Sequence, residues 1–253
     1  MGKVFEWCGY TWDCKMEGGR IIHPLYPYNW LSDSDDVLTI DEKGEMTMTF
    51  RENPKDVTYW NGQTYHPTIE RALIRSLESF DFGTFSLEAI MPKGYNVGAN
   101  FWLSGDDNWP PEIDICEAWG ENNDYFHIFT NYFPWIWPSW KTTTNVHYRD
   151  DELEHQHIKS KSVSYCKQKL NPTENWIKYE CEWLPDKITF KANGKVTRTV
   201  GKKVSNMLIN NLNTPEHGYR MDVIIDINPE DPTLVPLELI SPFKVRNFKY
   251  IPA

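Results

Sequence analysis

Residues 109–119 read Trp-Pro-Pro-Glu-Ile-Asp-Ile-Cys-Glu-Ala-Trp, and this stretch decides which fold we expect. Glu112 and Asp114 alternate with two isoleucines, which is the two-residue period of a β-strand with one buried face. On a regular strand Glu117 would fall on the buried face, where an unpaired carboxylate is costly. A β-bulge, one extra residue at Ile115-Cys116, resets the alternation. We therefore predict a bulged strand that carries all three acids on one face.

The same period recurs along most of the chain. Asn193-Gly194, a strong hairpin signal, joins two of the predicted strands. No long helical period is visible, and residues 134–175 and 206–218 are predicted to be long loops. Short strands between Gly, Pro, Asn and Asp clusters are typical of a β-sandwich, so we predict one all-β domain spanning 1–253, a two-sheet antiparallel sandwich. The predicted strands cover residues 46–50, 69–76, 85–91, 100–104, 112–119, 125–133, 177–183, 188–190, 197–200, 221–227 and 243–251.

Composition narrows the classes of function. The 253 residues include 26 Lys and Arg against 36 Asp and Glu, a formal net charge of −10, which disfavours binding to a nucleic-acid backbone. No apolar run approaches the roughly 18 residues that a membrane span needs. With 12 Trp, 13 Tyr and 12 Phe, many aromatic rings must lie near the surface. We expect a soluble monomer with neither nucleic-acid nor membrane partners.

The N-terminus and the cysteines each leave two alternatives. The first twelve residues lack the basic and apolar regions of a secretion signal. The protein is therefore either cytoplasmic, or secreted or periplasmic with a leader absent from this sequence. The five cysteines form no Cys-x-x-Cys pair of metal-binding or redox type. Cys8 and Cys14 either form a local disulfide in an oxidising compartment or are free thiols.

Three acids on one face indicate a particular chemistry. Retaining hydrolysis of a glycoside needs two carboxyl groups about 5–5.5 Å apart, one to attack the anomeric carbon and one to protonate the leaving oxygen. Because five residues of regular strand span about 16 Å, the bulge and a concave curve must bring Glu112 and Glu117 together. Asp114 between them can share a proton with a neighbouring Glu. The alternative, an ordinary solvated face, is disfavoured because like charges repel and tryptophans flank them.

These residues resemble a known family. Residues 112–117, Glu-Ile-Asp-Ile-Cys-Glu, are similar to the catalytic signature of glycoside hydrolase family 16 in its bulged form, Glu-x-Asp-x-x-Glu. The resemblance covers most of the chain from about Glu70 onward. Two positions depart from the family pattern, Pro111 where Gly is frequent and Asn131 where a second His is frequent. Further matching segments are 82–94 and 101–103 upstream, and 179–190, 193–194 and 243–250 downstream.

The resemblance implies a fold and roles. The fold is a jelly-roll sandwich with a carbohydrate cleft on its concave face. Glu112 is the implied nucleophile, Glu117 the general acid and base, and Asp114 the acid that assists the nucleophile. His127 is expected on the adjacent strand, facing the acids, and Asn131 nearby. The rings implied to line the sugar sites nearest the cut are Trp102, Trp109 and Trp119.

Other features receive weaker interpretations. In residues 133–140 two prolines stiffen a run of rings, and a flat ring can stack on a sugar face. At least one of Trp135, Trp137 and Trp140 is expected to face substrate. Four further basic residues could contact anionic sugar substituents, although ordinary surface charge is the favoured interpretation: Arg71, Arg75, Lys141 and Arg149. The group Glu152, Glu154, His155 and His157 is interpreted as a solvated loop rather than a metal site.

The sequence therefore predicts a retaining endo-acting β-glycoside hydrolase whose partner is a polysaccharide or oligosaccharide. The proposed chemistry needs no metal or cofactor, and a structural calcium ion would have ligands that the sequence does not single out. A β-1,3-glucan and a red-algal galactan such as agar, porphyran or carrageenan are both open as substrates. A non-catalytic carbohydrate-binding sandwich is the alternative function, and a protein-interaction domain is a third class.

Overall fold

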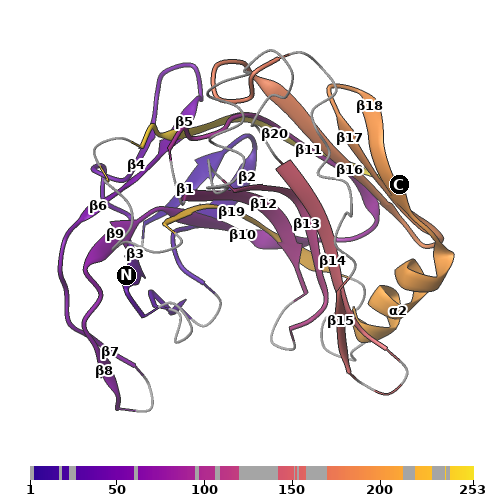
Figure 1. The fold of residues 1–253 in the computed structure, drawn as a ribbon, viewed down its shortest axis with the longest axis horizontal. Coiled ribbons are helices and arrows are strands. Elements are labelled where there is room, and N and C mark those ends of the chain that lie inside the picture. The colour runs from indigo at the N-terminus through magenta and orange to yellow at the C-terminus, as the bar shows by residue number, and fades with distance from the viewer. Residues whose placement is uncertain are drawn as a thin grey trace, which may run out of the picture.

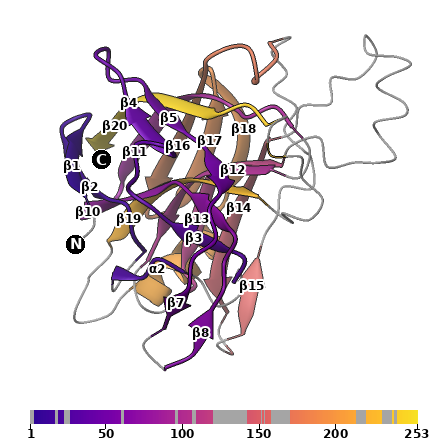
Figure 2. The same cartoon turned by 90° about the vertical axis from the view of Figure 1, so that its left-hand side faces the viewer.

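Alternating apolar residues build two large antiparallel sheets that pack face to face. In the computed structural model the eight-stranded sheet, here the inner sheet, is curved, and the seven-stranded outer sheet covers its convex face (Figure 1). The small β7–β8 hairpin projects on the side opposite the outer sheet in both views (Figures 1 and 2). The structure describes residues 3–16, 19–22, 27–59, 62–94, 97–105, 109–119, 142–150, 152, 154–157, 170–212, 220–229, 237 and 240–253.

The strands follow one another across each sheet in a non-sequential order. The inner sheet consists, in spatial order, of β1 (Val4–Trp7), β2 (Tyr10–Asp13), β10 (Leu73–Phe80), β19 (Met221–Pro229), β12 (Val97–Ser104), β13 (Glu112–Trp119), β14 (Thr142–Arg149) and β15 (His155–His157). The outer sheet consists of β18 (Lys195–Val200), β17 (Lys187–Ala192), β16 (Ile177–Leu184), β11 (Gly83–Ile90), β20 (Phe243–Pro252), β5 (Met46–Met48) and β4 (Leu38–Ile40).

Two small sheets and one helix complete the described fold. The small sheets are β3 (Asn29–Leu31), β9 (Ile69–Arg71) and β6 (Phe50–Glu52) in one, and β7 (Val57–Thr58) with β8 (Thr64–Tyr65) in the other. Strand β9 leads directly into β10 through Ala72, so the first small sheet extends the inner sheet. The helix is α2 (Lys202–Leu212).

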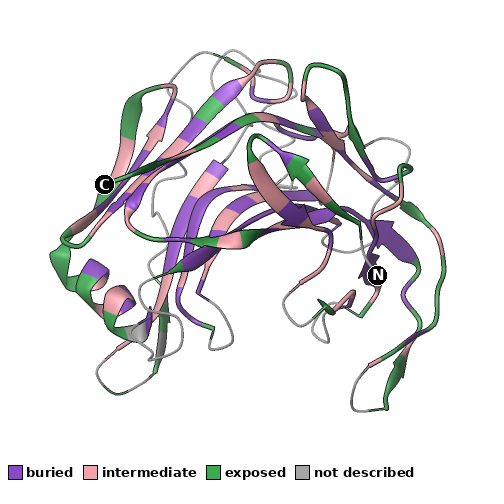
Figure 3. Ribbon diagram, turned by 180° about the vertical axis from the view of Figure 1, so that it is seen from behind, coloured by how far each residue is buried: buried purple, intermediate pink, exposed green. Residues whose placement is uncertain are grey.

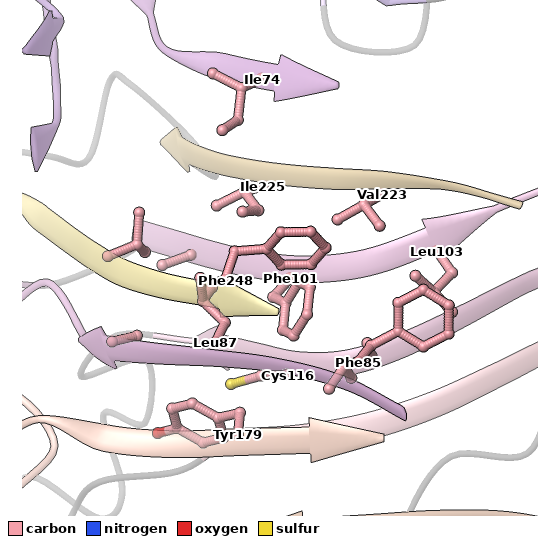
Figure 4. Close-up of a cluster of buried hydrophobic side chains, with 14 of the residues drawn as sticks. Ile74, Phe85, Leu87, Phe101, Leu103, Cys116, Tyr179, Val223, Ile225 and Phe248 are labelled. Carbon is pink, nitrogen blue, oxygen red and sulfur yellow. The ribbon is translucent and has the colours of Figure 1, made fainter. Parts of the chain in front are cut away.

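The core lies between the two large sheets. Phe101, Cys116 and Ile225 of the inner sheet meet Phe85 and Phe248 of the outer sheet, and all five side chains are at most 4% exposed (Figure 4). Buried residues line the facing sides of both layers, and exposed ones lie on the helix, the β7–β8 hairpin and the convex surface (Figure 3). Because side chains alternate along a strand, the other face of the inner sheet carries the remaining residues, which include the acids of β13 and β19 and a small apolar cluster at Leu73 and Ile224.

Most of the predicted strands are confirmed, and the all-β sandwich with them. Strands β17 and β18 are joined at Asn193-Gly194, where φ is 45° and 75°. Two consecutive residues of positive φ form the turn whose twist matches a hairpin, which explains why Asn-Gly stands there. The predicted strand 125–133 lies outside the described residues.

Both predicted long loops are partly wrong. Strands β14 and β15 lie within 134–175, where alternation at Thr142–Tyr148 was masked by the charged residues that follow it. Helix α2 begins before 206 and takes up the first half of the second predicted loop. Its buried residues Leu208 and Leu212 and its half-buried Val204 recur every four residues, which is a helical stripe. Three asparagines, poor helix formers, obscure that period.

Two further expectations concern cysteines and membranes. Cys8 is exposed and Cys14 buried, and both are free thiols, so the local disulfide is not formed. Burial raises the pKa of the Cys14 thiol to about 12, which keeps it protonated and unreactive. In the part of the chain that the structure describes, no helix is long and apolar enough to span a bilayer.

Candidate active site

A bulge in β13 brings the three acids to one face. Across β12, Phe101 pairs with Cys116 and Trp102 pairs with Asp114, so Ile115 has no partner of its own. Across β14 the register is also interrupted between Asp114 and Glu117. Ile113, Ile115 and Cys116 are all at most 2% exposed in the core. The predicted bulge is therefore confirmed, and Glu112, Asp114 and Glu117 share the concave face of the inner sheet.

Glu112 is surrounded by three polar neighbours. The Trp109 Nε1–H donates to Glu112 Oε2 at 2.8 Å, and His147 Nε2 lies 3.3 Å from Glu112 Oε1. The same His147 nitrogen lies 3.4 Å from Asp114 Oδ2. The Glu112 side chain is 14% exposed, and its strand position is directly opposite His147. Glu112 is thus held in place while one edge of the carboxyl group faces the concave side.

The electrostatics of Glu112 differ from those of an exposed carboxylate. Burial raises the pKa of Glu112 well above its usual range, and the negative charge of Asp114 raises it further. The Trp109 hydrogen bond acts in the opposite direction, as a positive charge on His147 would, and a hydrogen bond joins the Glu112 and Asp114 carboxyl groups. Two buried carboxyl groups in contact titrate as a pair. They are therefore expected to share one proton at neutral pH.

Glu117 has a different environment. Thr143 lies opposite it on β14, and the Thr143 hydroxyl donates to Glu117 Oε2 at 3.2 Å. Asn100 lies opposite it on β12. Glu117 is half-buried, and two residues, Ile115 and Cys116, separate it from the buried Asp114 along the bulged strand. The two outer acids thus have different partners, as separate acid and nucleophile roles would require.

A buried ion pair fixes the neighbouring Trp102. Asp226 Oδ1 accepts hydrogen bonds from Trp102 Nε1 at 3.3 Å and Asn100 Nδ2 at 3.1 Å. Asp226 Oδ2 accepts from Arg71 Nη1 at 2.8 Å, and Arg71 Nε donates to Asn29 Oδ1 at 2.8 Å. The Arg71 and Asp226 side chains are 6% and 8% exposed. This network holds the indole next to Asp114, which pairs with Trp102 in register.

Comparison with known proteins places the chain in a family. A model of glycosyl hydrolases family 16 matches residues 27–222. The chain belongs to glycosyl hydrolase family 16. No curated protein matches it. LamAcat from Zobellia galactanivorans is 13% identical, with a TM-score of 0.64 over 91% of this chain and 88% of that one.

Two other solved structures share the fold of this family 16 chain. Porphyranase B from Zobellia galactanivorans is 19% identical, with a TM-score of 0.59 over 95% of this chain and 86% of that one. The kappa-carrageenase from Pseudoalteromonas carrageenovora, solved with an oligotetrasaccharide of kappa-carrageenan, is 11% identical, with a TM-score of 0.59 over 88% and 86%. At sequence identities this low, the similarity to these structures shows a shared fold and nothing further.

The described strands beside β13 are β12 and β14, and His127, which was expected on the adjacent strand, lies outside the described residues. The imidazole that faces the acids is His147 of β14. The alternation of Thr144, Val146 and Tyr148 with polar residues could have revealed this strand. Among the rings, Trp102 and Trp109 lie at the site, and Trp119 pairs with Gly98 at the end of β13.

Several predicted substrate contacts cannot be placed. His127 and four other predicted residues lie outside the described residues, as does the side chain of Trp119. The four are Asn131, Trp135, Trp137 and Trp140.

The donor groups at the site are two carboxyls and one imidazole. Glu112, Asp114 and His147 place one donor atom each within 4.8 Å of one another, and among the described residues they are the group that could hold a cation. We assign no metal to them. Glu152 and Glu154 are exposed, and their backbone amides both donate to Asp150 Oδ1, so this segment is a turn.

Proposed function

We propose that this family 16 protein is a retaining endo-β-glycanase, with Glu112 as nucleophile, Glu117 as general acid and base, and Asp114 as the assisting acid. The observation that carries the proposal is the bulge in β13, which puts Glu117 on the face of Glu112 and Asp114. A carbohydrate-binding domain would use the same rings, but it gains nothing from three converging acids. Burial, and then the charge of Asp114, raise the pKa of Glu112, and a perturbed carboxyl pKa is typical of a functional site.

The proposed reaction is a double displacement. Glu117 donates its proton to the glycosidic oxygen as the Glu112 carboxylate attacks the anomeric carbon, which leaves a covalent glycosyl ester on Glu112. Glu117, now ionised, takes a proton from water, and the water oxygen displaces Glu112 from the anomeric carbon. For the first step Glu112 must be ionised. The Trp109 Nε1–H hydrogen bond stabilises that form of Glu112, against burial and the charge of Asp114, which raise its pKa.

A neutral β-glucan is the proposed substrate class. Two arginines of the concave face are neutralised, Arg71 by Asp226 and Arg75 by Asp222. Arg149 donates to the Trp109 carbonyl oxygen at 2.9 Å. A sulfated galactan would need cations that are free to bind sulfate, and none of these three arginines lacks a partner. Lys141 lies outside the described residues, so sulfated galactans are included in the test below.

Product analysis on a glycan panel tests the proposal. Purified protein is incubated with a β-1,3-glucan, a mixed-linkage β-glucan, agarose, porphyran and carrageenan, and products are sized and their linkages determined. Early release of mixed oligosaccharides indicates endo cleavage, and NMR of the fresh products reports the anomeric configuration. We expect β-configured oligosaccharides from a neutral glucan. Products that first appear as α-anomers would contradict retention, and binding without cleavage would favour a carbohydrate-binding domain.

The site of action follows from the size of the substrate. A polysaccharide does not cross a bacterial or eukaryotic plasma membrane unaided, so an enzyme that cuts inside the chain must meet it outside the cytoplasm. We therefore propose secretion or a periplasmic location. Fractionation of the producing cells with an antibody against the protein checks this proposal, and enrichment in the cytoplasm would contradict it.

A further inference from the structure

The orientation of the buried Asn145 amide can be assigned from its neighbours. Asn145 lies opposite Asp114 on β14 and is 1% exposed. The backbone N–H of Val146 donates to Asn145 Oδ1 at 3.0 Å. An N–H group can only donate, so this contact requires the amide oxygen at that position. The amide nitrogen Nδ2 must therefore lie on the other side, where it is 2.8 Å from His147 Nε2.

This contact determines the proton on His147. The Asn145 amide nitrogen carries two hydrogens and no lone pair, so it can only donate to His147 Nε2. A hydrogen on Nε2 would bring two donors face to face at 2.8 Å. Protonation of both ring nitrogens would do the same. The contact is satisfied in one form of the ring, the neutral imidazole with its hydrogen on Nδ1.

We propose that Asn145 is a positioning residue that holds His147 as the neutral Nδ1–H imidazole, so that a bare Nε2 faces Glu112 and Asp114. The shared proton then resides on a carboxyl group and not on the ring. Nε2 lies 3.3 Å from Glu112 Oε1 and 3.4 Å from Asp114 Oδ2. The two carboxyl groups, which a hydrogen bond joins, then share that proton between them.

The other charged groups around His147 are consistent with this assignment. Glu112 and Asp114 face it from β13, and the Trp109 ring lies 5.5 Å from its ring centroid. Arg149, two residues along β14, donates to the Trp109 carbonyl. On β15 the residue opposite His147 is His157, whose side chain lies outside the described part.

The first test needs no activity. Long-range ¹H–¹⁵N NMR of the whole chain labelled in histidine reports which ring nitrogen carries hydrogen, and His147→Gln assigns the signal among the seven histidines. At neutral pH we expect hydrogen on Nδ1 and a bare Nε2. A hydrogen on Nε2, in the other neutral form or in an imidazolium, would overturn the proposal. This result is decisive even if the protein hydrolyses no glycan.

The second test uses Asn145→Asp. An aspartate oxygen in place of Nδ2 accepts a hydrogen bond from Nε2–H, so NMR of the variant should show hydrogen on Nε2. The ring spectrum is the readout and the acid limb of kcat/KM is not, because the new buried carboxylate and a positive ring would change the pKa of Glu112 in opposite directions.

Asn228→Asp is the matched control, because it makes the same exchange on β19, where the Asn228 side chain accepts a hydrogen bond from Asn29. In Asn228→Asp the His147 signal should keep its hydrogen on Nδ1, as in the wild type. A structural role for Asn145 predicts lower stability of Asn145→Asp with the hydrogen still on Nδ1, and that outcome would refute the proposal. If Asn145→Asp does not fold, the wild-type NMR spectrum still decides.

Discussion

The buried carboxyl groups on the two sides of the concave face have different kinds of partner. On the side of β10 and β19 each buried carboxylate has its own arginine, Asp226 with Arg71 and Asp222 with Arg75. On β13, Glu112 and Asp114 instead face each other, with a neutral indole and an imidazole as partners. On the first side, here called the matched side, Asp226 also accepts a hydrogen bond from the Trp102 indole. On the second, here called the crowded side, two buried carboxyl groups are expected to share a proton, a feature that acid–base chemistry uses.

The largest expected effect is on the crowded side. Glu112→Gln keeps the shape and the Trp109 contact but removes the nucleophile, so kcat should fall by roughly four orders of magnitude. Binding of an oligosaccharide, measured by calorimetry, should be retained. Asp226→Asn is the matched control on the other side, because it makes the same exchange of carboxylate for amide outside the proposed chemistry. A Glu112→Gln variant with a tenth of wild-type activity would exclude Glu112 as the nucleophile.

The second largest effect belongs to the matched side and concerns stability. Asp226→Ala leaves the Arg71 guanidinium buried without its carboxylate, so the free energy of unfolding should fall by about 3–5 kcal/mol. Urea unfolding followed by tryptophan fluorescence measures this change.

The control for this prediction removes both charges. The double variant Arg71→Met with Asp226→Leu leaves no buried charge at this pair and should recover most of the lost stability. If Asp226→Ala lowers the free energy of unfolding by less than about 1 kcal/mol, the Arg71–Asp226 pair does not stabilise the matched side. The proposed difference between the two sides would then be wrong.

The difference between the two sides also explains which features of the fold and the site could be predicted from the sequence. The acids of β13 are four residues or fewer from the bulge that aligns them, so local alternation was sufficient to predict that they share a face. His147 comes from a strand paired across a long insertion, and Asp226 meets Arg71 across 155 positions of sequence. Alternation assigns a residue to a face but does not say which strands are neighbours. The sandwich was therefore predictable, whereas the partners of the acids were not.

A smaller effect is expected at the contact between the crowded side and its indole. Trp109→Phe removes the Nε1–H that donates to Glu112 Oε2, while an aromatic ring is kept beside His147. A hydrogen bond to a charged group contributes about 1.5–3 kcal/mol, so kcat/KM should fall by at least about tenfold. The acid limb should move to higher pH, because this hydrogen bond lowers the pKa of Glu112.

Trp30→Phe is the control for the indole exchange. Its Nε1–H donates to the Asn53 carbonyl in a separate small cluster of buried residues, away from the acids. The Trp30→Phe variant should change neither the position nor the steepness of the acid limb in the pH profile of kcat/KM. Equal shifts of the acid limb in the two variants would show that Trp109 does not act through Glu112.

The smallest expected effect is on the pH dependence of stability, and it comes from Glu112 on the crowded side. Because burial and Asp114 raise the pKa of Glu112 in the folded protein, the folded state binds more protons than the unfolded state between the two pKa values. The contribution of Glu112 to the stability of the wild type is therefore fully present below the ordinary pKa of a glutamate. It is lost as the pH rises through the pKa that Glu112 has in the folded protein. Glu112→Gln has no such loss, so the inactive variant should be more stable than wild type at pH 8, by about 1 kcal/mol, the usual scale at functional sites. Near pH 4 the difference should shrink, and a difference independent of pH would mean that the crowded side retains no proton.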